Sequence, residues 1–309
     1  MKDPHALGII GLVLSASISA AQQPQQYLIV GRWDLTVTDS SHRYPSWLEV
    51  ERSGDRTLVG RFVGVVGSAR PISKVELKDS VFRFSVPPQW EQGDSDVHVE
   101  GVMRGEQLSG WLTDPAGKRY TWTAKRAPLL RRTALPGWGA PIALFSGTDM
   151  ASWQTPGANW SVVNRVLTNT RAGSNLVTRQ TFNDFKLHLE FRYPPKGNSG
   201  VYLRGRYEVQ IEDSDALEPI QDHLGAVYGF LPPSEAAARR PGEWQAYDIT
   251  LVGRMVTVVL NGKTLIGNQE IPGITGGALD SDEAAPGPLM IQGDHGPVEF
   301  RNIVLTPAR

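Results

Sequence analysis

The sequence GNSGVYLRGRYEVQIEDS, residues 197–214, alternates apolar and polar side chains almost without interruption. Because successive side chains of a β-strand point to opposite faces, the pattern predicts a strand, or a hairpin closed by three residues around Gly205. One face is then buried against a second sheet, as in a β-sandwich. The polar positions are Tyr202, Arg204, Arg206, Glu208, Gln210 and Glu212.

Residues 142–309 are expected to form one all-β domain around this stretch. Short alternating runs recur from residue 142 onward, separated by turns rich in Gly and Pro. Asn261 and Gly262 are a residue pair typical of a type I′ hairpin turn. Only residues 233–243 have a composition that would allow a short helix. The domain is long enough for a two-sheet jelly roll.

Residues 27–126 form a separate series of short alternating runs, which predicts a small β-barrel or sandwich. Residues 127–141 contain three prolines and two glycines without periodicity and are predicted to be a linker. A barrel of this size has room for one small ligand, but nothing in the sequence indicates chemistry there. The large aromatics are expected to form its core: Trp33, Trp47, Phe62, Phe82, Phe84, Trp111 and Trp122.

The composition excludes several classes of protein. The 309 residues carry a net charge of −1 and no cluster of Lys and Arg, which argues against nucleic-acid binding. There is no cysteine, so disulfides, thiolate metal sites and cysteine nucleophiles are excluded. The composition does not indicate the oligomeric state.

Residues 1–21 resemble a secretory signal peptide. Lys2 precedes a short apolar run that ends in small residues near Ala20, which predicts an exported protein, periplasmic or secreted. An unstructured terminus or a misplaced start is the alternative. The run is too short to span a bilayer and no second long apolar run follows, so no stable membrane insertion is expected.

Two further segments of the second domain carry polar side chains that extend the polar face of residues 197–214. In KLHLEFRY, residues 186–193, Glu190 lies on the polar side of an alternating run. In MIQGDHGPVEFRN, residues 290–302, Gln292, Asp294 and His295 follow a strand end broken by glycine. A solvated outer face is one explanation. We favour a cleft, because Tyr, Arg, Glu, Gln and His suit directed hydrogen bonds.

Aromatic residues in the same domain could form the floor of a groove of the size of a sugar. They are Trp153, Trp160, Tyr228 and Trp244. A cation site built from Asp213, Asp222 and His223 is a weaker alternative, because the acidic triplets lack the spacing of a calcium loop. Neither NGKT, residues 261–264, nor GNSGV, residues 197–201, completes a phosphate loop or a nucleophile elbow.

The second domain resembles the bacterial 3-keto-disaccharide hydrolase domain family over about residues 140–307. The resemblance rests on these motifs, in this order: ALFSGTDMASW, NWSVVNRVL, FKLHLEFRYPPKGNSGVYLRGRYEVQIEDS, GAVYGFLPP, PGEWQAYDITLVGRMVTVVLNGKTLI and GPLMIQGDHGPVEFRNIVL. It implies a concanavalin A-like jelly roll and an exported bacterial enzyme. The implied activity is cleavage of 3-keto-glycosides or 3-keto-disaccharides by elimination and hydration, a net hydrolysis. The first domain lies outside the resemblance.

The implied chemistry assigns expected roles to the polar set. An elimination needs a base for the C2 proton, a donor for the enolate oxygen and an acid for the leaving oxygen. Glu208 is the expected base or metal ligand, with Glu190 as its partner, and His295 is the expected acid or metal ligand. Arg204 and Arg206 would stabilise the enolate. The remaining residues expected to bind the sugar are Tyr202, Gln210, Gln292, Asp294, Tyr228 and Trp244.

Two other interpretations remain open from the sequence. A jelly roll hosts carbohydrate-binding proteins without catalysis as readily as enzymes, and a purely structural surface module is the third alternative. Arg204 and Glu208 would then form a simple ion pair, and His295 would cap a turn. The resemblance also implies one divalent cation of unknown identity, and no nucleotide cofactor is expected.

Overall fold

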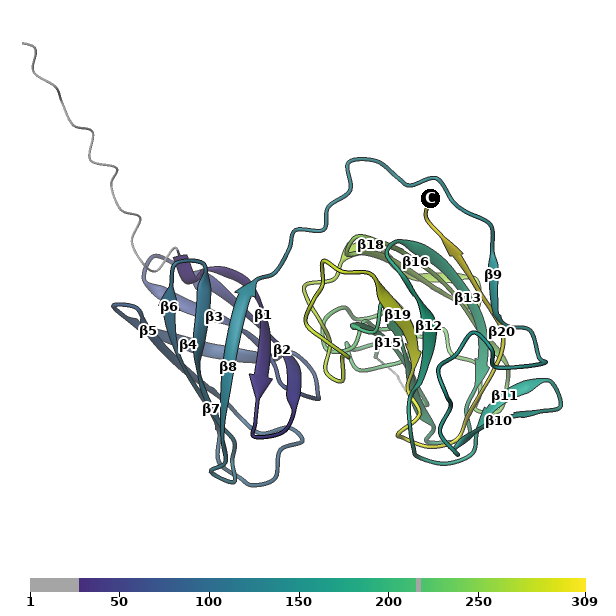
Figure 1. Ribbon diagram of the computed structural model, residues 1–309, viewed down its shortest axis with the longest axis horizontal. Helices are drawn as coiled ribbons and strands as arrows, with labels where there is room; N and C mark the ends of the chain where they lie inside the picture. The colour runs from purple at the N-terminus through teal and green to yellow at the C-terminus, as the bar shows by residue number, and fades with distance from the viewer. Residues whose placement is uncertain (1–27, 215–217) are drawn as a thin grey trace, which may run out of the picture.

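The computed structural model describes residues 28–214 and 218–309, which form two β-domains joined by one long connection (Figure 1). The predicted signal peptide, residues 1–21, lies outside the described residues. The prediction of an all-β chain, with a small barrel followed by a jelly-roll sandwich, is confirmed. No helix among the described residues has the length and apolar character needed to cross a bilayer.

The first domain is a closed antiparallel barrel in which every strand pairs with its neighbour in sequence and β8 pairs back onto β1. Its strands are β1 (Gly31–Thr38), β2 (Arg43–Ser53), β3 (Thr57–Val63), β4 (Arg70–Lys78), β5 (Val81–Val86), β6 (Val97–Arg104), β7 (Gln107–Thr113) and β8 (Arg119–Arg126). Phe82 and Trp122 pack so closely over Gly101 that a Cβ there would lie 2.4 Å from the Phe82 ring. Aromatic side chains therefore fill this part of the interior.

Two of the aromatic residues predicted for the barrel core lie elsewhere. Trp111 is 44% exposed on the outer surface of the barrel, under the guanidinium of Arg119. Trp47 is fully buried, but its indole packs into the core of the second domain and meets Phe230 edge to face. Alternation identifies which side chains are apolar, but not which neighbour covers them.

The second domain is a sandwich of a large and a small sheet (Figure 1). The large sheet runs β10-β11-β20-β13-β16-β17-β18, with β9 also paired to β20, and the small sheet runs β12-β19-β14-β15. The strands of the large sheet are β9 (Ile142–Phe145), β10 (Trp160–Val163), β11 (Val166–Asn169), β13 (Phe185–Arg192), β16 (Gln245–Val252), β17 (Met255–Leu260), β18 (Lys263–Glu270) and β20 (Val298–Pro307). The small sheet contains β12 (Leu176–Phe182), β14 (Asn198–Leu203), β15 (Tyr207–Glu212) and β19 (Gly287–Ile291).

Two hairpins form where the sequence predicts them. β14 and β15 pair from Leu203–Tyr207 outward, which leaves three residues, Arg204 to Arg206, in the turn. β17 and β18 are joined by Asn261 and Gly262, whose φ angles of 53° and 84° suit a type I′ turn. Residues 233–243 contain bends and turns but no helix.

The two domains pack directly against each other. Gly273 lies under the indole of Trp47, where a Cβ would come within 2.1 Å of the ring nitrogen. The backbone N–H of Gly277 donates to the carbonyl oxygen of Val65 at 3.0 Å, and the guanidinium of Arg32 pairs with Glu270 at 2.7 Å. Strands and loops of both domains thus take part in the contact, and Gly277 also lines a pocket beside it.

Candidate functional site

A pocket of about 420 Å³ lies where the outer face of the small sheet meets the barrel. We call it the hairpin pocket, because the β14–β15 hairpin forms its floor. The sandwich lines it with Asn175, Asn198, Tyr202, Glu208, Gln210, Tyr228, Gly276, Gly277, Gln292, Asp294 and His295, and the barrel with Val66, Gly67 and Trp90.

The hairpin presents its polar side chains to this pocket through strand alternation. Val201, Val209 and Ile211 point into the sandwich core, so Tyr202, Glu208 and Gln210 point the other way. Tyr202 and Glu208 lie directly opposite each other in the ladder. An ordinary solvated face would leave these side chains exposed, yet each is at least 96% buried under the surrounding loops and the barrel.

Two glycines leave space for the acidic centre of the pocket. Oε1 of Glu208 lies over Gly200, where a Cβ would approach it to 2.1 Å. The hydroxyl of Tyr202 lies beside Gly277, where a Cβ would approach it to 2.6 Å. Alanine at either position would displace the Tyr202–Glu208 pair.

Burial raises the pKa of Glu208 to about 8. The hydrogen bond from Tyr202 opposes this shift, and the nearby charges of Asp294 and Glu212 add to it. The hydroxyl of Tyr202 lies 2.9 Å from Oε2 of Glu208 and 3.0 Å from the carbonyl oxygen of Gly276. The hydroxyl proton of Tyr202 can be donated to either oxygen. Tyr202 can therefore donate to Glu208 when the carboxyl group is ionised, and to Gly276 when the carboxyl group is neutral. A carboxyl group with this pKa can exchange protons near neutral pH.

The second titratable pair is Asp294 and His295, on the loop that follows β19. Nδ1 of His295 lies 2.6 Å from Oδ1 of Asp294, and this hydrogen bond raises the pKa of His295 and lowers that of Asp294. The imidazole is therefore held more readily in its charged form. It is about half exposed, so it combines a positive charge with access to the pocket.

Neutral polar groups complete the lining. Oε1 of Gln292 is buried without a hydrogen-bond partner among the described residues, so it can accept a bond from a ligand hydroxyl. Burial raises the pKa of Tyr228 to about 12, so its phenol is a neutral donor. Asn175 is already engaged, because its Oδ1 accepts the backbone N–H of Gly293 at 2.9 Å.

The expectation that Glu190 shares a cleft with Glu208 is wrong. Glu190 lies on β13 of the large sheet, where it accepts hydrogen bonds from Arg301 at 2.7 Å and Asn302 at 2.6 Å. The polar faces of the two sheets point away from their common core, so they lie on opposite sides of the sandwich. Trp244 belongs to that same far side, under Arg192 and Arg301, and does not line the hairpin pocket.

Arg204 and Arg206 also lie outside the hairpin pocket. Arg204 is fully buried and donates to the hydroxyl of Tyr207 at 2.7 Å, while Arg206 pairs with Asp280 at 2.7 Å. The three-residue turn, with φ of 53° at Arg204, ends the strict alternation from which their position was inferred. Trp153 and Trp160 are core residues rather than a sugar platform.

Asn198 also lines the pocket, although it is not among the predicted site residues. Strand alternation could have identified it, because Asn198 and Tyr202 are an even number of positions apart on β14 and so point to the same face. No sequence pattern predicts that Val66, Gly67 and Trp90 line the pocket. They come from the other domain, and their position depends on how the barrel docks.

The residues present do not form a recognisable site for the divalent cation that the resemblance implies. Among residues 28–214 and 218–309, no group of three or more His, Asp or Glu side chains is arranged to hold a metal ion. Glu208 and His295, the candidate ligands, both line the hairpin pocket, but no third His, Asp or Glu among the described residues completes a metal-binding group with them.

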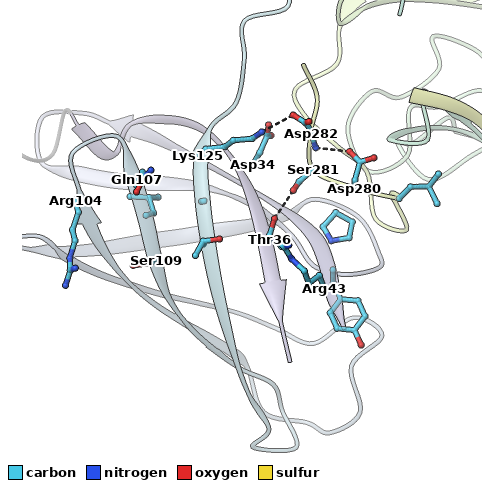
Figure 2. Close-up of a pocket in the computed structure, with 16 residues that line it drawn as sticks. Asp34, Thr36, Arg43, Arg104, Gln107, Ser109, Lys125, Asp280, Ser281 and Asp282 are labelled. Atoms are coloured by element: carbon cyan, nitrogen blue, oxygen red, sulfur yellow. Dashed lines mark hydrogen bonds and ion pairs between the residues drawn. The ribbon is translucent and has the colours of Figure 1, made fainter. Parts of the chain in front are cut away.

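A larger hollow of about 730 Å³, the barrel groove, is lined by barrel strands and by residues 279–282 of the sandwich. Figure 2 shows Lys125 and Thr36 of the barrel pointing toward Asp282 and Ser281 of the sandwich, at 2.9 and 3.2 Å. These contacts are ordinary interface bonds. The hairpin pocket therefore remains the better candidate, because it alone of these two hollows contains both Glu208 and the His295–Asp294 pair.

Comparison with known proteins identifies one family. The 3-keto-alpha-glucoside-1,2-lyase-like domain matches residues 140–306, which is more than half of the chain and leaves the barrel outside. No curated protein matches the chain.

Solved structures similar to this chain include proteins of Parabacteroides distasonis ATCC 8503 that carry the provisional name of glycosyl hydrolase. One is 33% identical, with 53% of this chain and 82% of that chain covered and a TM-score of 0.48. A second is 20% identical, with 55% and 94% covered and a TM-score of 0.45. A third is 24% identical, with 54% and 98% covered and a TM-score of 0.44.

Proposed function

The chain belongs to the 3-keto-alpha-glucoside-1,2-lyase-like domain family, and from this premise we propose that it cleaves glycosides whose sugar carries a ketone at C3. The reaction is an elimination followed by a hydration. The ketone acidifies the hydrogen on C2, so a base can remove that proton while the bond from C1 to the leaving oxygen breaks. The leaving oxygen takes up a proton, and a C1–C2 double bond remains. Water then adds its oxygen to C1 and a proton to C2, which completes a net hydrolysis.

Glu208 is the proposed base. At neutral pH about one tenth of a carboxyl group with a pKa of about 8 is ionised, and that fraction is a stronger base than an ordinary carboxylate. Tyr202 donates to the ionised form and can turn to the carbonyl oxygen of Gly276 once Glu208 holds the proton. The pair therefore takes up and returns one proton without leaving a buried charge unpaired.

His295 is the proposed acid. Asp294 holds its imidazole in the charged form, from which it can give a proton to the leaving oxygen. The same charge favours the build-up of negative charge on the substrate during the elimination. Asp294 acts through His295 and is a positioning residue.

The enolate needs a donor other than the two arginines that the sequence indicated. The neutral phenol of Tyr228 is the proposed donor to the oxygen on C3, since it lines the same pocket as Glu208. Gln292 is proposed to accept a hydrogen bond from a sugar hydroxyl through its unpartnered Oε1. Gln210 and Asn198 would bind further hydroxyls at the floor.

One observation carries this proposal: a buried carboxyl group with a pKa of about 8 and a positively polarised imidazole line the same pocket of a family member. The experiment compares nitrophenyl 3-keto-glucoside with the parent nitrophenyl glucoside. Release of nitrophenol from the keto compound only is the expected result. Equal release from both would indicate an ordinary glycosidase, and sugar binding without release would favour the carbohydrate-binding alternative.

We also propose that the protein acts after export, as the pattern of residues 1–21 predicts. Fractionation of the producing cells tests this. A mature chain in the periplasm or medium that begins after Ala20 or Ala21 is the expected result, and an unprocessed chain in the cytoplasm would contradict it.

A further inference from the structure

The barrel opens beside the hairpin pocket. A second hollow of about 420 Å³, the barrel mouth, is lined at this end by apolar and aromatic side chains that include Val37, Phe62, Leu112, Tyr44 and Tyr120. Its volume lies within the roughly 300–1,000 Å³ that is usual for small-molecule pockets. The barrel mouth thus offers an apolar space of ligand size on a domain that the family match does not include.

The barrel mouth and the hairpin pocket share two residues, Val66 and Trp90. Trp90 is 66% exposed and Val66 49% exposed, which are high values for apolar side chains in a folded domain. Trp90 and Tyr228 both line the hairpin pocket. A ligand that fills the hairpin pocket can therefore continue over Trp90 into the barrel mouth.

The segment that carries Trp90 is held in place despite its exposure. The carboxylate of Glu91 accepts hydrogen bonds from the backbone N–H of Trp90 at 3.2 Å and from the guanidinium of Arg70 at 2.8 Å. Gln89 and Ser68 bond each other at 2.9 and 2.8 Å. Gly67 makes room for the indole, since a Cβ there would lie 2.8 Å from Cδ1 of Trp90. An exposed aromatic ring on a rigid segment is suited to binding, because little motion is lost when a ligand stacks on it.

We propose that the barrel mouth is the leaving-group subsite of this enzyme and that it takes the neutral aromatic aglycone of a 3-keto-glycoside. This inference rests on the proposed function. The sugar ring occupies the hairpin pocket over Glu208, and the aglycone stacks on Trp90 and enters the barrel mouth.

The lining determines the class of aglycone. The two acidic groups at the barrel mouth are already bonded, Glu91 to Arg70 and Asp114 to the hydroxyl of Tyr120. The remaining surface is largely aliphatic and aromatic, so an aromatic ring gains more from burial there than a second sugar with many hydroxyls to satisfy. The lining contains no Lys, Arg or His, so an anionic aglycone would meet no counter-charge there.

The test measures kcat/KM for two 3-keto-glucosides, one with a naphthyl and one with a methyl aglycone. Trp90→Ala removes the stacking ring, and Ala116→Arg places a long side chain at the barrel mouth from the exposed β7–β8 turn. Each variant is expected to lower the naphthyl-to-methyl ratio of kcat/KM by about tenfold, the scale of a lost apolar subsite. Trp111→Ala is the matched control, because this exposed tryptophan lines neither hollow; its ratio should equal that of the wild type.

A ratio within twofold of the wild type in both test variants would overturn the proposal, as would a larger loss for a disaccharide than for the naphthyl compound. Binding of free 2-naphthol, followed by calorimetry, separates this inference from the proposed function. If the wild type cleaves neither substrate but binds 2-naphthol and Ala116→Arg does not, the reaction is wrong and the apolar site stands. If cleavage occurs and 2-naphthol does not bind, the reaction stands and this subsite is wrong.

Discussion

The hydroxyl of Tyr202 lies 2.9 Å from Oε2 of Glu208, and the two residues face each other across the β14–β15 ladder. The same hydroxyl reaches the carbonyl oxygen of Gly276, and the next residue, Gly277, donates its N–H to Val65 of the barrel. The titratable centre of the pocket is therefore linked by hydrogen bonds to the domain contact. The barrel therefore forms part of the wall of the hairpin pocket, through Val66, Gly67 and Trp90.

Glu208→Gln is expected to lower kcat by about 10²–10⁴-fold, the usual effect of losing a general base. The substitution keeps the shape of the side chain and leaves an oxygen that can accept from Tyr202, so the melting temperature should change little. The matched control is Glu190→Gln, a glutamate bonded to Arg301 on the opposite side of the sandwich, which should retain full turnover. Turnover of Glu208→Gln close to that of the wild type would remove Glu208 from the mechanism.

Tyr202→Phe removes the hydrogen bond that stabilises the ionised form of Glu208. The pKa of Glu208 should then rise further above its usual range, so a smaller fraction is ionised at pH 7. At pH 7 we expect kcat/KM of the variant to be roughly threefold to tenfold below that of the wild type. At pH 9 the difference between the variant and the wild type should be smaller. A loss of the same size at both pH values would show that Tyr202 acts in some other way.

The sequence predicts part of this site for a physical reason. Strand alternation places Tyr202, Glu208 and Gln210 on one face because only the hairpin's own geometry is involved. The same rule fails for Arg204, where the turn interrupts the strand. Periodicity also cannot say which sheet a strand joins, so Glu190 was assigned to the wrong side. Trp90 depends on domain docking, which leaves no local pattern.

The pH dependence of kcat/KM should be bell-shaped. Glu208 must be ionised to act as the base, so the rate rises with pH toward the pKa of about 8. His295 must be protonated to act as the acid, so the rate falls as the pH passes its raised pKa. A rate that declines steadily from pH 6 to pH 9 would contradict the assignment of Glu208 as the base.

Asp294→Asn is expected to move the whole bell to lower pH. Asp294 raises the pKa of His295 through their hydrogen bond and raises that of Glu208 through its charge, so both values should fall when the charge is removed. The check is the pH profile of the variant beside that of the wild type. Movement of one limb only, or of either limb to higher pH, would count against this arrangement.

Asp34 should make the stability of the protein depend on pH. The pKa of this carboxyl group is raised from 3.8 to about 9 in the folded protein. Burial is the largest cause, and the negative charge of Glu283 is the second. The folded state therefore keeps a proton that the unfolded chain loses, and the free energy of unfolding falls as the pH rises through this window. The slope from this one group is at most about 1.4 kcal/mol per pH unit.

Asp34→Asn removes that slope and is expected to stabilise the protein at pH 8 relative to the wild type. Urea unfolding at pH 5, 6, 7 and 8 is the measurement. Asp55→Asn, on a fully exposed side chain, is the control and should follow the wild type. Parallel stability curves for Asp34→Asn and the wild type would show that Asp34 is not held neutral in the fold.

The central claim is that the C1–O bond breaks after loss of the C2 proton to Glu208. The most direct measurement is the cleavage of a methyl 3-keto-glucoside in D₂O, with the deuterium content at C2 of the sugar product determined by mass spectrometry and NMR. Product incubated with Glu208→Gln corrects for spontaneous exchange. D₂O must enter the pocket for the hydration, so the carboxyl proton that Glu208 took from C2 can exchange before a proton is returned, and the account predicts deuterium at C2 of the product formed by the wild type. Product in which every molecule retains its original hydrogen at C2 would contradict it.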